Sequence, residues 1–128
     1  MKKVRNKRQI VEATYDWCCE KFGTPLKTKM FPELEIVSNS KSDDFGTYYE
    51  RLITINTAKC KTVSSLIRVV IHEYTHFLQM PKLRDMKVYD ELYRIHGYKE
   101  HPMEVEAYNS ELKHFRNCLK YLQRRKIA

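Results

Sequence analysis

Three residues near the middle of the chain could do chemistry together: His72, Glu73 and His76. Positions four apart lie on the same face of an α-helix, so two imidazoles at this spacing can bind one cation. Neutral imidazole nitrogens are good zinc ligands, and a carboxylate beside them can accept a proton from a metal-bound water. We therefore expect His72 and His76 to hold Zn²⁺ and Glu73 to be the catalytic base.

The sequence around this motif favours a metal site over a chance pattern. The segment Ser65–Met80 is rich in Ile, Val and Leu, Thr62 or Ser64 can cap a helix there, and Pro81 ends it. The same motif occurs in unrelated proteins whose histidines only form hydrogen bonds inside a core. Two histidines and a glutamate are costly to bury without partners in so apolar a helix, and this favours the metal.

A zinc site needs a third protein ligand, for which the later sequence offers His96, His101, Glu104 and Glu106. An apolar stripe runs along the helix expected after Pro102: Val105, Tyr108, Leu112, Phe115, Leu119 and Leu122. At about 100° per residue, Glu104 lies about 50° from the centre of this stripe and Glu106 about 150° away. If the stripe packs on the central helix, Glu104 can reach the metal. Alternatively, both glutamates simply favour the positive end of their helix.

The stretch from Phe45 to Leu122 resembles the gluzincins, peptidases that hold zinc with the two histidines of H-E-x-x-H and a glutamate on a later helix. The similarity is carried by a predicted hairpin and by the segments His72-Glu-Tyr-Thr-His-Phe-Leu-Gln79, Gly97-Tyr98 and His101-Pro-Met-Glu-Val-Glu-Ala107. The chain is most similar to the minimal gluzincins of bacteria and phages, which often have Pro-x-Glu-x-Glu-Ala at this place. The resemblance implies a zinc-dependent peptidase in which Glu104 is the third ligand.

The sequence departs from related patterns at two places. Thermolysin-like gluzincins have an acidic residue four positions after the ligand glutamate, which orients a histidine, but this chain has Tyr108 there. Glu111 lies on the same side of the helix and is a candidate for this task. The metzincin pattern requires Gly and His where this chain has Gln79 and Lys82, so that family is excluded.

Two other functions remain open. A histidine third ligand, His96 or His101, would make the chain similar to the Spartan-type proteases, which act on proteins crosslinked to DNA. A metal-stabilised binding or virion structural protein without turnover would belong to a different class. Within the peptidase hypothesis, Tyr98 or His101 could stabilise a developing oxyanion, and both could equally be packing residues of a loop.

The charge and the cysteines limit which partners and which further metal sites the chain could have. The chain has 128 residues and a formal net charge of +8, with basic residues concentrated at Lys2–Arg8 and Arg124–Lys126. Solvated tails explain such runs best, so nucleic acid is the less favoured partner and a peptide or protein substrate the favoured one. The four cysteines match no zinc-finger spacing and are expected to be reduced and buried.

The chain contains no apolar run long enough for a signal peptide or a membrane span. We therefore expect a cytoplasmic monomer, or a protein packaged in a virion.

Apolar spacing and turn residues predict the secondary structure. The expected elements are a helix over Lys7–Phe22, strands at Leu34–Val37, Phe45–Tyr49 and Leu52–Asn56, the central helix, a weaker helix over Asp85–His96 and a last helix over Pro102–Arg124. These elements predict a single α+β domain over residues 1–128, and the resemblance to the gluzincins implies that this domain is zincin-like. A small sheet of about three strands would lie beside the central metal-binding helix, with one helix at each end of the chain.

Overall fold

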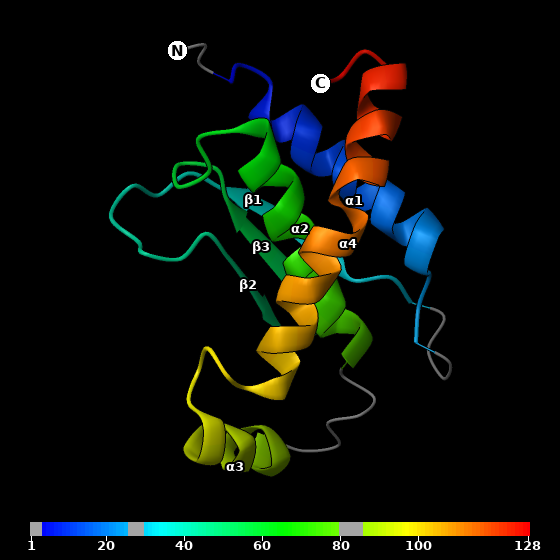
Figure 1. Cartoon of the computed structure of the whole chain (residues 1–128). Helices are drawn as coiled ribbons and strands as arrows, with labels where there is room; N and C mark the ends of the chain where they lie inside the picture. Colours follow the sequence, from blue (N-terminus) through cyan, green and yellow to red (C-terminus); the bar gives the residue numbers. More distant parts are fainter. Residues whose placement is uncertain (1–3, 26–29, 80–85) are drawn as a thin grey trace.

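Four helices and three strands follow one another in the computed structural model, which describes residues 4–25, 30–79 and 86–128. They are α1 (Lys7–Phe22), β1 (Glu33–Val37), β2 (Gly46–Tyr49), β3 (Leu52–Asn56), α2 (Val63–Gln79), α3 (Met86–His96) and α4 (Pro102–Arg124). The expected α+β class is confirmed, and the observed elements lie within about two residues of the predicted ones (Figure 1). Two predicted helix ends lie outside the described residues: Asp85, the expected first residue of the weaker helix, and Met80, the expected last residue of the central helix.

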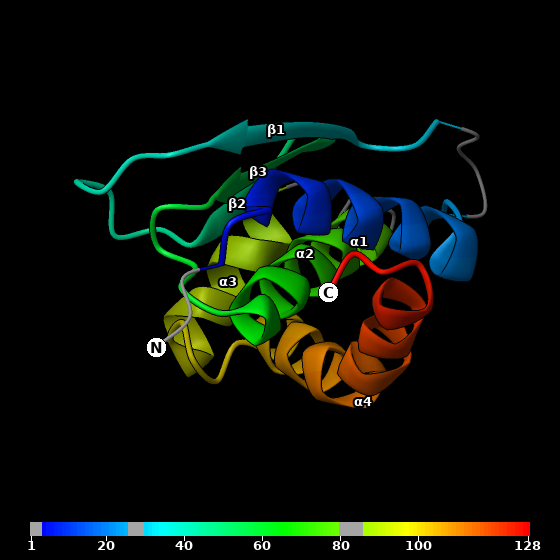
Figure 2. The same cartoon turned by 90° about the horizontal axis from the view of Figure 1, so that it is seen from above.

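The sheet has the strand order β1-β3-β2, with β1 parallel and β2 antiparallel to β3. The predicted hairpin is therefore confirmed, and β2 is an edge strand. The side chains of Ile53 and Ile55 on the central strand are fully buried, and the helices lie on one side of the sheet (Figure 2). Since one face of the sheet is covered by α2, the alternation of apolar residues in β3 fixes which side chains enter the core.

Helix α2 is anchored at its start and buried along most of its length. The Ser65 N–H donates to Thr62 Oγ1 at 3.0 Å, and the Thr62 N–H donates to Ser65 Oγ at 3.1 Å, which is a reciprocal N-terminal cap. Leu66, Ile67 and Ile71 are fully buried, because α1, α4 and the sheet all pack against this helix. The helix that carries the metal motif is therefore held from several sides.

Helix α4 does not pack through the stripe that its hydrophobicity predicts. Its buried residues are Glu104, Ala107, Glu111, Cys118 and Leu122. Val105 and Leu112, by contrast, are 42% and 67% exposed. The predicted stripe is wrong in its first half because the face against α2 carries two carboxylates that pair with side chains of α2. Glu104 nevertheless faces the interior and Glu106 faces solvent, as predicted.

The turn between β2 and β3 is built from residues that disfavour its conformation. Glu50 and Arg51 have φ values of 46° and 66°. Positive φ at both central residues of a two-residue hairpin favours Asn-Gly, and a left-handed non-glycine residue costs roughly 1–2 kcal/mol. We expect the double substitution Glu50→Asn/Arg51→Gly to raise the free energy of unfolding by about 1 kcal/mol, measured by urea denaturation. The pair Glu50→Ala/Arg51→Ala retains the strain and is the control. A double Asn-Gly variant no more stable than this control would contradict the prediction.

Candidate metal centre

Two helices bring three possible metal ligands together. His72 and His76 of α2 and Glu104 of α4 each offer an atom within 4.8 Å of the others. The His76 Nε2 lies 2.7 Å from one Glu104 oxygen, and the His72 Nε2 lies 3.2 Å from the other. Tetrahedral zinc with bonds of about 2.0–2.1 Å keeps its ligand atoms about 3.3 Å apart. This group could hold a metal ion, and its two nitrogens and one carboxylate fit zinc.

Both imidazoles are held through the ring nitrogen that faces away from Glu104. The His72 Nδ1–H donates to Glu111 Oε2 at 2.6 Å, and the His76 Nδ1–H donates to Gln79 Oε1 at 2.8 Å. Because the oxygens can only accept, these bonds place a proton on each Nδ1, so each Nε2, which faces a Glu104 oxygen, is the ring nitrogen that a cation would bind in place of a proton. Sequence analysis did not identify Gln79 as a partner, although its position three residues after His76 was a usable signal.

Glu111 takes the place of the acidic residue that is missing at position 108. Its second oxygen accepts from Arg68 Nε at 3.0 Å, so one carboxylate joins Arg68 and His72. The Tyr108 ring instead packs edge-on against His72, with 4.8 Å between ring centroids. The candidate role of Glu111 is therefore supported by a hydrogen bond. Arg68 was not predicted, yet its position four residues before His72 places it on the same face of α2.

The charges of the ligand group are coupled. Burial lowers the pKa of His72, but hydrogen bonds to Glu104 and Glu111 outweigh it and raise this pKa to about 9. Burial raises the pKa of Glu104, but hydrogen bonds to His72 and His76 lower it to about 2. A cation binds the neutral imidazole nitrogens and displaces protons from them, so binding at this group would release protons.

Glu73 lies beside the ligand group, against the edge of the sheet. Its side chain is buried, and burial raises its pKa to about 7 although His76 and His72 act to lower it. A Cβ at Gly46 would lie 2.8 Å from Val69 Cγ2 and 3.2 Å from Glu73 Cγ, so only glycine lets β2 approach α2 this closely. A carboxyl group with a pKa near 7 can accept and return a proton at neutral pH.

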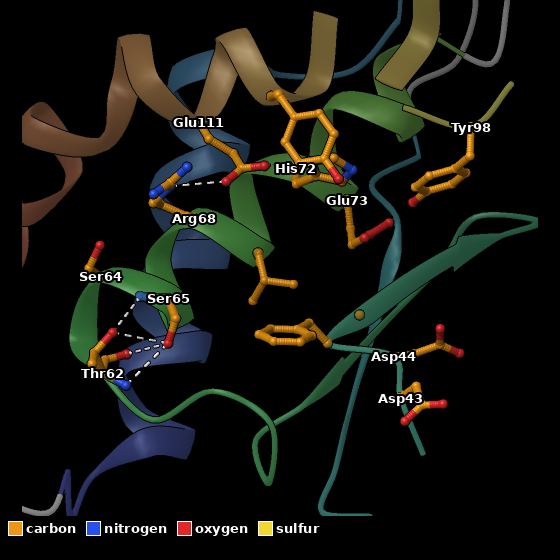
Figure 3. Close-up of a pocket in the computed structure, with 14 residues that line it drawn as sticks. Asp43, Asp44, Thr62, Ser64, Ser65, Arg68, His72, Glu73, Tyr98 and Glu111 are labelled. Atoms are coloured by element: carbon orange, nitrogen blue, oxygen red, sulfur yellow. Dashed lines mark hydrogen bonds and ion pairs between the residues drawn. The ribbon is translucent and has the colours of Figure 1, made fainter. Parts of the chain in front are cut away.

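A pocket of about 540 Å³ opens beside this group. Its lining includes His72 and Glu73 together with Asp43, Asp44, Phe45, Gly46, Thr62, Ser64, Ser65, Arg68, Val69, Tyr98, Tyr108 and Glu111 (Figure 3). Figure 3 shows Arg68 joined to Glu111 on one side of the pocket and Tyr98 on the side of Glu73. A molecule bound in this pocket would therefore contact Glu73, the expected base, directly.

The other predicted candidates lie elsewhere. The His101 side chain is buried, and its Nδ1 accepts from the Met103 N–H at 3.1 Å to cap α4, so it does not line the pocket. His96, at the end of α3, and Glu106 are exposed. Within residues 4–25, 30–79 and 86–128, the one group able to hold a metal is formed by His72, His76 and Glu104.

Comparison with known proteins found no family model, no curated protein and no solved structure that matches the chain. In the described part of the chain, no helix combines the length and the apolar character needed to cross a membrane.

The choice of third ligand can be tested with the two glutamates of α4. We expect the parent protein to bind one Zn²⁺ per chain, and Glu104→Ala to weaken zinc binding about 100-fold or more, because it removes a donor atom. Competition with a chromogenic chelator measures the affinity. The exposed Glu106→Ala is the matched control and should bind zinc like the parent. Equal losses in the two variants, or a loss confined to His101→Ala, would refute the assignment.

The role of Glu111 gives a separate prediction. Glu111→Ala leaves all three ligand atoms in place but removes the acceptor that orients His72, so zinc affinity should fall about 10- to 100-fold. Glu111→Gln keeps an oxygen acceptor, so its zinc affinity should fall less than that of Glu111→Ala. The same chelator competition measures both variants, and circular dichroism checks the fold. An Ala variant with the affinity of the parent would show that His72 needs no such partner.

Proposed function

We propose that this protein is a zinc metallopeptidase of the gluzincin type with a zincin-like fold. The observation that carries the proposal is that Glu73 lies beside His72, His76 and Glu104 and opens into the same pocket as His72. Two imidazoles and one carboxylate are the protein ligands of a well-known class of catalytic zinc site, which keeps a further position open for water or substrate.

The edge strand supports a peptide as the substrate. Strand β2 pairs only with β3 in the described sheet, and Phe45 and Gly46 at its start line the pocket. An extended peptide can add to such an edge by main-chain hydrogen bonds. A peptide bound along β2 would pass Glu73, because Gly46 lies against that side chain.

The chemistry assigned to the residues is hydrolysis of a peptide bond. Zinc, when bound, lowers the pKa of water toward neutrality and polarises a carbonyl group. The Glu73 carboxylate accepts the proton of the attacking water and delivers it to the leaving amine nitrogen. Tyr98 lines the pocket and is the candidate donor to the developing oxyanion, whereas His101 is placed in the helix cap.

The buried Glu73 also argues against a protein that binds a metal without catalysing a reaction. A protein that uses the metal only for stability has no need for a carboxyl group in the pocket beside the ligands. Burying an ionisable carboxyl group costs free energy, so its presence beside the ligands favours a role in catalysis. The arrangement therefore favours the enzyme over a metal-stabilised binding or virion structural protein.

Glu73→Gln separates catalysis from structure. The amide keeps the size of the side chain but cannot accept the proton, so we expect zinc content and fold to be retained while the hydrolytic rate falls about 10²- to 10⁴-fold. A substrate is first found by proteomic identification of cleavage sites in a lysate treated with the zinc-loaded protein. Cleavage must be blocked by a chelator and restored by zinc.

The control for this experiment is Glu106→Gln, the same chemical change at an exposed site, which should cleave like the parent. Full cleavage by Glu73→Gln would assign the hydrolysis to another site or to a contaminant, and the proposed function would fall.

A further inference from the structure

The positive charge of the chain is concentrated in two segments far apart in sequence. Residues 1–11 contain five basic and no acidic residues, and residues 112–128 contain six basic and no acidic residues. Of the 24 basic and 16 acidic residues in the chain, 13 basic and all 16 acidic residues therefore lie in residues 12–111. The net charge of +8 thus arises from the two ends, while the part that forms the metal centre is slightly acidic.

The structure joins these two ends. The Asn6 side chain donates to the Ile127 carbonyl at 2.6 Å, across 121 residues of sequence, and α1 packs against α4. The start of α1 and the end of α4 lie at the same end of the molecule, opposite α3 (Figure 1). The basic residues that flank this contact, Arg5 on one side and Arg125 and Lys126 on the other, therefore lie close together and are exposed to solvent.

A line of four cations follows the outer face of α4. It consists of Lys113, Arg116, Lys120 and Arg124, here called the basic stripe. At about 100° per residue these side chains fall within about 80° of one another, on the side opposite the buried Cys118 and Leu122. All four are exposed, and within the described residues none of them forms an ion pair. The stripe covers 11 residue steps, about 16 Å along the helix.

We propose that the basic stripe, together with the exposed Arg125 and Lys126 that follow it, binds the phosphate backbone of a nucleic acid. A row of cations along one helix suits a row of phosphates, and binding would release counterions. Asn117 and Gln123 are exposed beside the stripe and can donate to phosphate or sugar oxygens. The proposal does not depend on the peptidase function.

An anionic membrane fits this surface less well. Membrane-surface helices combine cations with exposed large apolar side chains that enter the lipid. The large apolar residues that are strongly exposed in the described structure lie before residue 113, and none belongs to the stripe. Leu112, which is 67% exposed beside Lys113, adjoins the stripe, so the basic surface has one apolar side chain at its edge and not the continuous apolar face of a membrane-surface helix.

The two sites occupy different parts of α4. Glu104 and Glu111 face inward in the first half of the helix, whereas the stripe faces outward in the second half. A nucleic acid on the stripe would leave the pocket beside His72 accessible, so peptide and nucleic acid could be bound together.

The test uses the full-length chain and a fluorescein-labelled 30-base-pair DNA duplex, with the single strand as a second probe, in anisotropy titrations between 50 and 200 mM salt. We expect Lys113→Gln/Arg116→Gln/Lys120→Gln to bind about tenfold or more weakly at 100 mM salt. The slope of log affinity against log salt should become shallower by about 2–3, because about three phosphate contacts are lost. The matched control is Lys41→Gln/Lys61→Gln/Lys99→Gln, which removes the same charge from exposed positions elsewhere and should bind much like the parent.

Three results would overturn the proposal. Equal weakening in the two triple variants would mean that net charge alone attracts DNA. If the parent showed no salt-dependent DNA binding, DNA would not be the ligand of this surface. Binding to phosphatidylcholine–phosphatidylserine vesicles at 100 mM salt without binding to DNA would assign the surface to a membrane. Glu73→Gln should bind DNA like the parent, so the outcome is independent of whether the chain is a peptidase.

Discussion

The contact between α2 and α4 determines the rest of this structure, because it buries two carboxylates that are tolerable only when paired. Glu104 meets both histidines of the motif, and Glu111 meets His72 and Arg68. An unpaired charge in this position would be strongly destabilising, whereas a paired and hydrogen-bonded one is not. The pairing therefore sets the rotation and the position of α4 on α2. A bound cation would strengthen the same contact, since it binds only when both helices are in place.

The same contact makes the centre rigid. Helix α2 has the sheet on one side, α1 and α4 on others, and a reciprocal cap at its start, so His72, Glu73 and His76 project from a fixed backbone. Hydrogen bonds to Glu111 and Gln79 then fix the rings themselves. A catalytic zinc site needs such orientation before substrate arrives, because small displacements of its ligands weaken binding and catalysis. On the proposed function, the fold is organised to supply this orientation.

The sequence predicted the elements well, and it predicted contacts between elements less well. Helix and strand limits follow from local signals, such as the apolar spacing of Lys7–Phe22 and the proline at the start of α4, and these were confirmed. The apolar stripe of α4 was wrong, because hydrophobicity cannot reveal that a glutamate is buried by pairing with a residue more than thirty positions away. Arg68 was missed for the same reason, whereas the hairpin with its turn at Glu50 and Arg51 was predicted from the flanking strands although the turn lacks the favoured glycine.

The division of α4 into two faces has an electrostatic consequence. From Glu104 to Lys113, the first cation of the basic stripe, the helix rises nine residue steps, about 14 Å, and to Arg124 it rises 20 steps, about 30 Å, while the screening length at physiological salt is about 8 Å. Solvent screening therefore weakens the effect of the exposed stripe on the ligand group, most of all for the far cations, and the charges of that group are balanced by their own buried partners. A helix of uniform charge would have coupled the two regions. If both proposals hold, the helix can place a polyanion and a peptide on one rigid body without one weakening the binding of the other.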